Sequence, residues 1–168
     1  MRQRNYGMWV VVIALTLAVL GGVPARGTQP QSAPSFTAAD QRAIRSAVDG
    51  YFEAFTAKDF ASFGKYFQAP FVVFGRQVRI LATLQDVVRQ WRGIREPLDN
   101  SAYGASKVLQ IRIIPVSSER ALADIHWQRL LKDGAVMSEG AEFYFMSKSS
   151  GSWKLAGVMG QQLALFGQ

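Results

Sequence analysis

The sequence predicts an α+β fold in which three N-terminal helices pack on a strongly curved, mostly antiparallel sheet, forming a cone with one pocket. The order of the elements predicts it. Apolar residues recur at helical spacing in the first half of the chain, and four long alternating stretches then fill residues 103–162. The length of 168 residues suffices for one domain with a hydrophobic core, and is too short for two domains that each have one.

The first 27 residues have the pattern of a secretory signal peptide. Two arginines precede the apolar run Met8–Leu20, and small residues follow it. We expect cleavage after Ala25 or Gly27 and a periplasmic or secreted protein. The alternative, an uncleaved anchor, is disfavoured because the run is shorter than the roughly 20 residues that a spanning helix needs. We therefore expect no stable membrane anchor after cleavage.

Composition excludes several classes of function. Cleavage after Gly27 would leave 16 basic and 12 acidic residues, a charge of about +4, which gives little support to nucleic-acid binding. Arg89, Arg92 and Arg95 are interpreted as the solvated face of a helix. The chain has no cysteine and one histidine, so it cannot build a His/Cys metal site. It has no phosphate-binding glycine loop or dinucleotide fingerprint, and we expect no cofactor.

Three helices are predicted in the first part of the domain, after a polar linker over residues 28–36. Thr37 and Asp40 form a capping box that opens the first helix. Asp59 caps a shorter second helix that reaches Phe67. A second capping box at Thr83-Leu-Gln-Asp86 opens the third helix, which ends before a proline.

Strands occupy the rest of the domain, which we place at residues 37–162, with a C-terminal tail at 163–168. A short apolar pair separates the second and third helices, and Asp133-Gly134 is a strong hairpin signal between two of the long strands. The predicted strands are Phe71–Phe74, Val78–Leu81, Val108–Val116, Ala121–Leu131, Val136–Met146 and Trp153–Gly160.

The chain resembles the nuclear transport factor 2-like superfamily, in its SnoaL-like branch. The resemblance rests on the segment Tyr51–Asp59, on Phe67 and Pro70, and on the closing segment Gly151–Leu155. It implies the α+β cone over nearly all of the mature chain. The superfamily hosts isomerases, dehydratases, hydrolases, ligand binders and dimerisation modules, so function must be argued from the site. We expect a homodimer formed through the sheet.

Asp124 and His126 are the first candidates for chemistry. They are two residues apart in a predicted strand and so share a face. With a two-residue turn, antiparallel pairing puts Asp124 opposite Phe143 and His126 near Ala141. In such aromatic surroundings the carboxylate would orient the imidazole, which could act as a general base.

The alternative is that this face is the solvent or dimer side of the sheet. The other parity of the same strand carries Ala121, Ala123, Ile125 and Trp127, and it has the better claim to the core.

Tyr51 is the second candidate. Resemblance to steroid isomerases implies that a tyrosine here donates a hydrogen bond to a developing oxyanion. The two acids of those enzymes are missing, because this chain has Phe74 or Gly75 at one place and Phe143 or Tyr144 at the other. Steroid isomerisation is therefore disfavoured, and Tyr51 also fits a core aromatic of an amphipathic helix.

The predicted pocket wall is aromatic, and the same residues would equally serve as core. It consists of Phe55, Phe74, Trp91, Tyr103 and Phe143. Arg112 and Glu142 are assigned no role, because they could pair across the sheet or lie in water.

Three functions follow, in order of preference. The first is an exported domain that binds a small apolar ligand, because few charges are expected to reach the cone. The second is a cofactor-independent proton-transfer enzyme, an isomerase, dehydratase or hydrolase, in which His126 is the base, Asp124 orients it and Tyr51 donates to substrate oxygen. The third is an interaction module that dimerises through its sheet.

Overall fold

The computed structural model describes residues 35–166. The predicted signal peptide, its cleavage at Ala25 or Gly27, and residues 28–34 of the predicted linker lie outside the described residues. Within residues 35–166, no helix combines the length and the apolar character that crossing a membrane requires.

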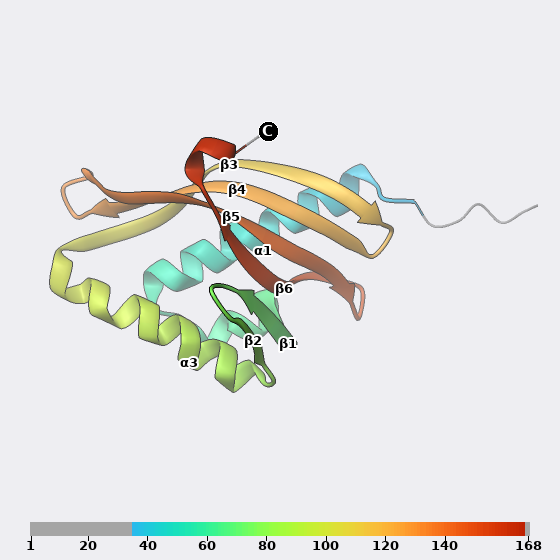
Figure 1. The fold of residues 1–168 in the computed structure, drawn as a ribbon, viewed down its shortest axis with the longest axis horizontal. Coiled ribbons are helices and arrows are strands. Elements are labelled where there is room, and N and C mark those ends of the chain that lie inside the picture. The colour runs from blue at the N-terminus through green and yellow to red at the C-terminus, as the bar shows by residue number, and fades with distance from the viewer. Residues whose placement is uncertain (1–34, 167–168) are drawn as a thin grey trace, which may run out of the picture. The chain divides into compact units, whose positions relative to one another are not determined.

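Three α-helices and six strands make up the described chain (Figure 1). The helices are α1 (Ala38–Ala57), α2 (Phe63–Tyr66) and α3 (Leu84–Arg95). The strands are β1 (Phe67–Phe74), β2 (Val78–Leu81), β3 (Tyr103–Ser117), β4 (Arg120–Leu131), β5 (Val136–Ser149) and β6 (Ser152–Gln161). The 3-10 turns are Phe60–Ser62, Glu96–Ser101 and Leu163–Leu165.

All strands form one sheet in the order β2-β1-β6-β5-β4-β3, and only the β1–β6 pair is parallel. Figure 1 shows the long strands curving over α1, with α3 lying beside the short β1–β2 hairpin. The predicted fold class, helices on a curved and mostly antiparallel sheet, is confirmed.

Both predicted capping boxes are present. Thr37 accepts a hydrogen bond from the backbone of Asp40, whose carboxylate accepts one from the backbone of Thr37; Thr83 and Asp86 repeat the arrangement at the start of α3. The Asp40 carboxylate also binds Lys148 and the indole of Trp153, each at 2.8 Å. These hydrogen bonds, that of Lys148 most of all, hold the pKa of Asp40 well below its ordinary value. Asp40 therefore ties the start of α1 to the sheet.

The second helix is shorter than predicted. It ends at Tyr66, and Phe67 begins β1 instead of ending the helix. Pro70 lies inside this strand, between the pairings of Phe67 and Val72 with β6, where the register is irregular. A proline is tolerated there because no regular ladder hydrogen bond needs its missing N–H.

The turn between β4 and β5 also differs from the prediction. Four residues, 132–135, connect the strands, and a bulge follows Arg129. The bulge compensates for the longer turn, so the predicted register holds beyond it. Asp124 lies opposite Phe143, and His126 lies opposite Ala141.

The concave face of the sheet carries the core. On β4 this face presents Ala121, Ala123 and Ile125, which are at most 3% exposed. On β5 it presents Tyr144 and Met146, both 1% exposed. The more apolar parity of β4 thus belongs to the same core cluster as the buried residues of α1, as the alternative interpretation of the strand proposed, and the opposite parity forms the convex face.

Candidate functional site

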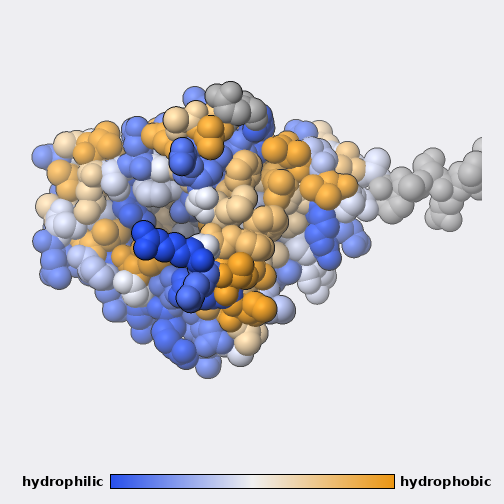
Figure 2. Space-filling view, viewed as in Figure 1, coloured by the Kyte–Doolittle hydropathy of each residue, from blue (hydrophilic) through white to orange (hydrophobic). Residues whose placement is uncertain are grey.

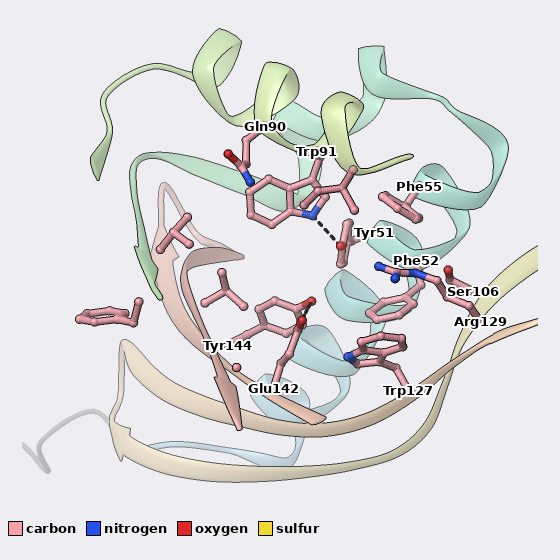
Figure 3. Close-up of a pocket in the computed structure, with 15 residues that line it drawn as sticks. Tyr51, Phe52, Phe55, Gln90, Trp91, Ser106, Trp127, Arg129, Glu142 and Tyr144 are labelled. Atoms are coloured by element: carbon pink, nitrogen blue, oxygen red, sulfur yellow. Dashed lines mark hydrogen bonds between the residues drawn. The ribbon is translucent and has the colours of Figure 1, made fainter. Parts of the chain in front are cut away.

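A cavity of about 200 Å³ lies between the concave face of the sheet, α1 and α3 (Figure 3). Its wall is mainly aromatic, with a few polar side chains. The lining residues are Tyr51, Phe52, Phe55, Val73, Phe74, Gln90, Trp91, Ile94, Ser106, Trp127, Arg129, Glu142, Tyr144, Val158 and Gly160.

Two hydrogen bonds donated by aromatic side chains organise the polar part of the cavity. Nε1 of Trp91 donates to the hydroxyl of Tyr51 at 2.6 Å, and the hydroxyl of Tyr144 donates to Glu142 at 2.7 Å. An indole N–H is only a donor, so Tyr51 accepts this bond and keeps its own proton for another acceptor. The rings of Tyr51 and Tyr144 meet edge to face, with centroids 6.0 Å apart. Tyr144 lowers the pKa of Tyr51, and Tyr51 raises the pKa of Tyr144.

Burial sets the protonation of these groups. Desolvation raises the pKa of Glu142, while the hydrogen bond from Tyr144 and the charge of Arg129 oppose the rise. Desolvation also raises the pKa values of Tyr51 and Tyr144. Both phenols therefore remain hydrogen-bond donors at neutral pH, and Glu142 holds its proton more readily than an ordinary carboxyl.

Arg129 and Trp127 line the cavity from β4. The guanidinium of Arg129 lies over the indole of Trp127, 4.8 Å from the ring centroid. In Figure 3 both side chains extend toward the space that Tyr51 and Glu142 also face. The cavity thus contains a cation and a carboxylate.

Four of the aromatic residues singled out in the sequence line the cavity: Tyr51, Phe55, Phe74 and Trp91. The ring of Phe74 also packs on Phe145 of the convex face, with centroids 5.2 Å apart.

Tyr103 and Phe143 do not line the cavity, contrary to prediction. Tyr103 is buried under the guanidinium of Arg95, 4.3 Å from its ring, and its hydroxyl bonds to Ser106. Phe143 has the opposite parity to Tyr144 and lies beside Met159 on the convex face. The pleat of β5 therefore removes it from the cone.

Asp124 and His126 do not reach the cavity either, so the pocket-facing placement predicted for this pair is wrong. Asp124 is fully buried on the convex face, where Arg112 donates to it at 2.9 Å and Gln161 donates to its other oxygen. The reason is parity, because the alternate residues of β4 are more apolar and occupy the core.

His126 lies on the same convex face as Asp124. Its Nε2 is 3.5 Å from a Glu139 oxygen, and its ring centroid is 5.7 Å from that of Phe166. Since Tyr51 lies in the cavity on the other side of the sheet, the three residues do not converge as the enzyme hypothesis required.

Glu142 and Arg129 are the polar residues that sequence reasoning missed. Glu142 is paired with Ile125 in the ladder and alternates with Phe143 along β5. Once Ile125 is assigned to the core, the same pairing puts Glu142 on the core side. The signal was therefore present in the register. Within residues 35–166, no three His, Asp or Glu side chains are grouped so as to hold a metal ion.

Residues 40–163 match the model of a family described as NTF2-like protein (DUF6841). Comparison with curated proteins gives no significant match.

Solved structures share the fold at low identity. A protein of unknown function with a cystatin-like fold from Nostoc punctiforme is 12% identical, with 79% of this chain and 98% of that chain covered and a TM-score of 0.63. A ketosteroid isomerase-like protein from Erwinia carotovora atroseptica is 18% identical, with 76% and 98% covered and a TM-score of 0.52. A protein from Catenulispora acidiphila in complex with S-DNPA is 16% identical, with 75% and 95% covered and a TM-score of 0.59.

These structures show the fold alone. The resemblance to the nuclear transport factor 2-like superfamily is confirmed, and the SnoaL-like branch stays a prediction. The family match spans most of the chain, and the protein belongs to the NTF2-like family DUF6841.

Proposed function

We propose that this protein binds a small molecule with a largely apolar body in the cone cavity. The observation that carries the proposal is a cavity of about 200 Å³ walled by aromatic side chains from α1, α3 and the sheet. Engineered apolar cavities of about 150 Å³ hold benzene. The cavity therefore suits a ligand of about one ring with a few further atoms.

The polar groups of the cavity further restrict which ligands fit. Two charged side chains, Arg129 and Glu142, line the cavity among otherwise uncharged residues. Tyr51 has a proton to donate, and Glu142 offers its remaining lone pairs. A ligand that fits must therefore carry at least one hydrogen-bonding group besides its apolar body.

A cofactor-independent proton-transfer enzyme is the second candidate, and Glu142 favours it. Desolvation raises the pKa of Glu142 above its ordinary value, and a carboxyl shifted in this direction by an aromatic cavity can serve as a general acid and base. In this version Glu142 takes the place that the sequence gave to His126, and Tyr51 donates to the oxygen that gains charge. The likeness to a ketosteroid isomerase-like protein is compatible with this chemistry.

Export and self-association complete the proposal. Export rests on the signal-peptide pattern of residues 1–27, and sequencing the N-terminus of the mature protein tests it.

A homodimer through the sheet is supported by exposed apolar residues on the face that carries Phe74. Val78 is 62% exposed and Ile80 is 68% exposed. Figure 2 shows apolar surface over the β1–β2 hairpin, to which Val78 and Ile80 belong. Light scattering of the mature protein measures its mass in solution.

The binding proposal is tested by titrating the mature protein with benzyl alcohol and following tryptophan fluorescence. Two tryptophans, Trp91 and Trp127, line the cavity, so we expect a saturable change. Val158→Phe fills the cavity and should abolish the change. Val116→Phe makes the same substitution at a strand position that is 65% exposed and should preserve it. Equal titrations of both variants would contradict binding in the cone.

The enzyme candidate has its own test. Acetophenone has one ring and exchangeable protons beside its carbonyl, and NMR in D₂O follows their replacement by deuterium. We expect the wild-type protein to accelerate this exchange, and Glu142→Gln to remove the acceleration while retaining acetophenone binding. Binding without accelerated exchange would leave the ligand-binding function alone.

A further inference from the structure

We propose that the cavity selects ligands that carry a carboxylate, which the guanidinium of Arg129 and Nε1 of Trp127 bind together. The inference rests on the proposed function and names the chemical class of its ligand. It is carried by two lining residues, Arg129 and Trp127, whose guanidinium and buried indole N–H have no acceptor among the described residues.

Arg129 is the first of these donors. Within residues 35–166 it makes no hydrogen bond and no ion pair, and its recorded contact is the stacking on Trp127. Its charge nevertheless lowers the pKa values of Glu142 and Tyr51, which places it among the polar groups of the cavity. A guanidinium has five N–H donors in a planar fork that matches a carboxylate.

Trp127 is the second donor. Its Nε1 is buried and has no hydrogen-bond partner in the part of the chain that the structure describes. A buried N–H without an acceptor is unfavourable, and few such groups persist in proteins without a reason. A ligand oxygen that reached both Trp127 and Arg129 would satisfy this group.

The neighbouring strand holds the indole of Trp127 in place. Gly140 is its partner across the ladder, and a Cβ built on Gly140 would lie only 2.7 Å from Cζ2 of the indole. The glycine therefore makes room for the flat ring. The guanidinium of Arg129 then lies over that ring. The packing of Gly140 against the indole, and of the indole against the guanidinium, therefore fixes the position of both side chains.

Glu142 opposes an anionic ligand less than an ordinary carboxyl would. Burial raises its pKa, so its neutral form is favoured more than in an ordinary carboxyl, and one of its oxygens already accepts from Tyr144. The other lining residues with polar side chains, among them Gln90 and Ser106, are uncharged. Arg129 is thus the cation among the lining residues, and the cavity volume of about 200 Å³ allows a ring with one carboxylate.

The test compares benzoate with benzamide, its neutral isostere, by calorimetric titration of the mature protein at pH 7. We expect benzoate to bind about tenfold more tightly, as one charge-assisted pair allows. Arg129→Met keeps the aliphatic stem and should abolish the preference while benzamide still binds. Trp127→Phe keeps a ring and removes the N–H, and should weaken benzoate binding by a smaller factor.

Arg92→Met is the matched control. The guanidinium of Arg92 also lies over an aromatic ring, that of Phe60 at 5.1 Å, but on the outside of the cone. This variant should retain the full preference for benzoate. Thermal melting of each variant checks its folding, and Arg129→Gln replaces the methionine variant if the latter does not fold.

Two outcomes overturn the inference in distinguishable ways. If benzamide binds as tightly as benzoate, or if Arg129→Met keeps the preference, the carboxylate inference fails while cavity binding stands. If benzyl alcohol, benzoate and benzamide all fail to bind, or if Val158→Phe leaves their binding unchanged, the proposed function fails as well.

Discussion

The two faces of the sheet treat their carboxylates differently. On the convex face Asp124 is fully buried and both of its oxygens have partners, in Arg112 and Gln161. On the concave face Glu142 has one hydrogen bond, from Tyr144, and lines a cavity. A carboxylate whose partners are all supplied by the fold is a structural element. One that faces a cavity has capacity left for a ligand.

The arginines follow the same division. Arg112 is paired with a carboxylate on the convex face, whereas Arg129 stacks on an indole and has no ion pair within residues 35–166. Both lie on long neighbouring strands, and the alternation of side chains decides which of them faces the cone. The comparison predicts that the convex cluster affects stability and that the concave cluster affects binding.

Asp124→Ala should have the largest effect on stability. It leaves Arg112 and Gln161 without their buried acceptor, and we expect a loss of about 2–3 kcal/mol in the free energy of unfolding. The estimate stays below that for a fully buried pair because the Arg112 side chain is 42% exposed and can turn to water. Urea denaturation measures the loss, with Glu119→Ala at an exposed turn as the control.

The benzyl alcohol titration of Asp124→Ala tests the other half of this comparison. Because Asp124 lies outside the cavity, binding should be unchanged once the variant is folded. A folded variant with wild-type stability and weakened binding would reverse the roles that we give to the two faces.

The fold was predictable because its signals are local. The capping boxes at Thr37 and Thr83 and the register that puts Asp124 opposite Phe143 depend on neighbouring residues and on one turn. The site was harder, because it depends on which side of the sheet the helices cover. Asp124 and His126 look like catalytic partners in sequence, although the more apolar alternate residues of the strand favour the other face for the core, and the burial of Ile125 shows that the pair points away.

The missed residues teach the same lesson. Nothing in the residues next to Glu142 in the sequence marks it as a site residue. Its role in the cavity comes from the hydrogen bond of the Tyr144 hydroxyl and from the desolvation that raises its pKa. Both are consequences of tertiary packing. Phe67 was misassigned for a related reason, since its pairing with Leu155 of β6 overrides its helical spacing.

Gly140→Ala should have the second largest effect. Its Cβ would lie 2.7 Å from the indole of Trp127, so the ring must shift, and we expect a loss of about 1–2 kcal/mol by overpacking. The shift should also remove the preference for benzoate over benzamide. Gly160→Ala on β6 is the control for stability, because nothing lies within 4 Å of its added Cβ. Equal unfolding of the two variants would show that Trp127 is not held by Gly140.

Tyr51→Phe should have a smaller effect. It removes the acceptor of the Trp91 N–H, and we expect a loss of about 1 kcal/mol, because water in the cavity can replace the phenol oxygen. Tyr66→Phe is the matched control, since its hydroxyl makes no hydrogen bond within residues 35–166. Thermal or urea unfolding compares the two, and a loss in Tyr66→Phe as large as that in Tyr51→Phe would contradict the assignment.

Glu142→Gln should have the smallest effect, visible only as a change in pH dependence. The pKa of Glu142 is raised in the folded protein above its ordinary value of 4.5, so the folded state binds this proton more tightly than the unfolded state. Its contribution to stability is therefore fully present below pH 4.5 and falls as the pH rises through the raised pKa. Urea unfolding from pH 4 to pH 8 should show the glutamine variant gaining stability relative to wild type across this window. Glu119→Gln should follow the wild type throughout. A parallel pair of curves for wild type and Glu142→Gln would mean that the cavity hydrates this carboxylate as well as bulk water does.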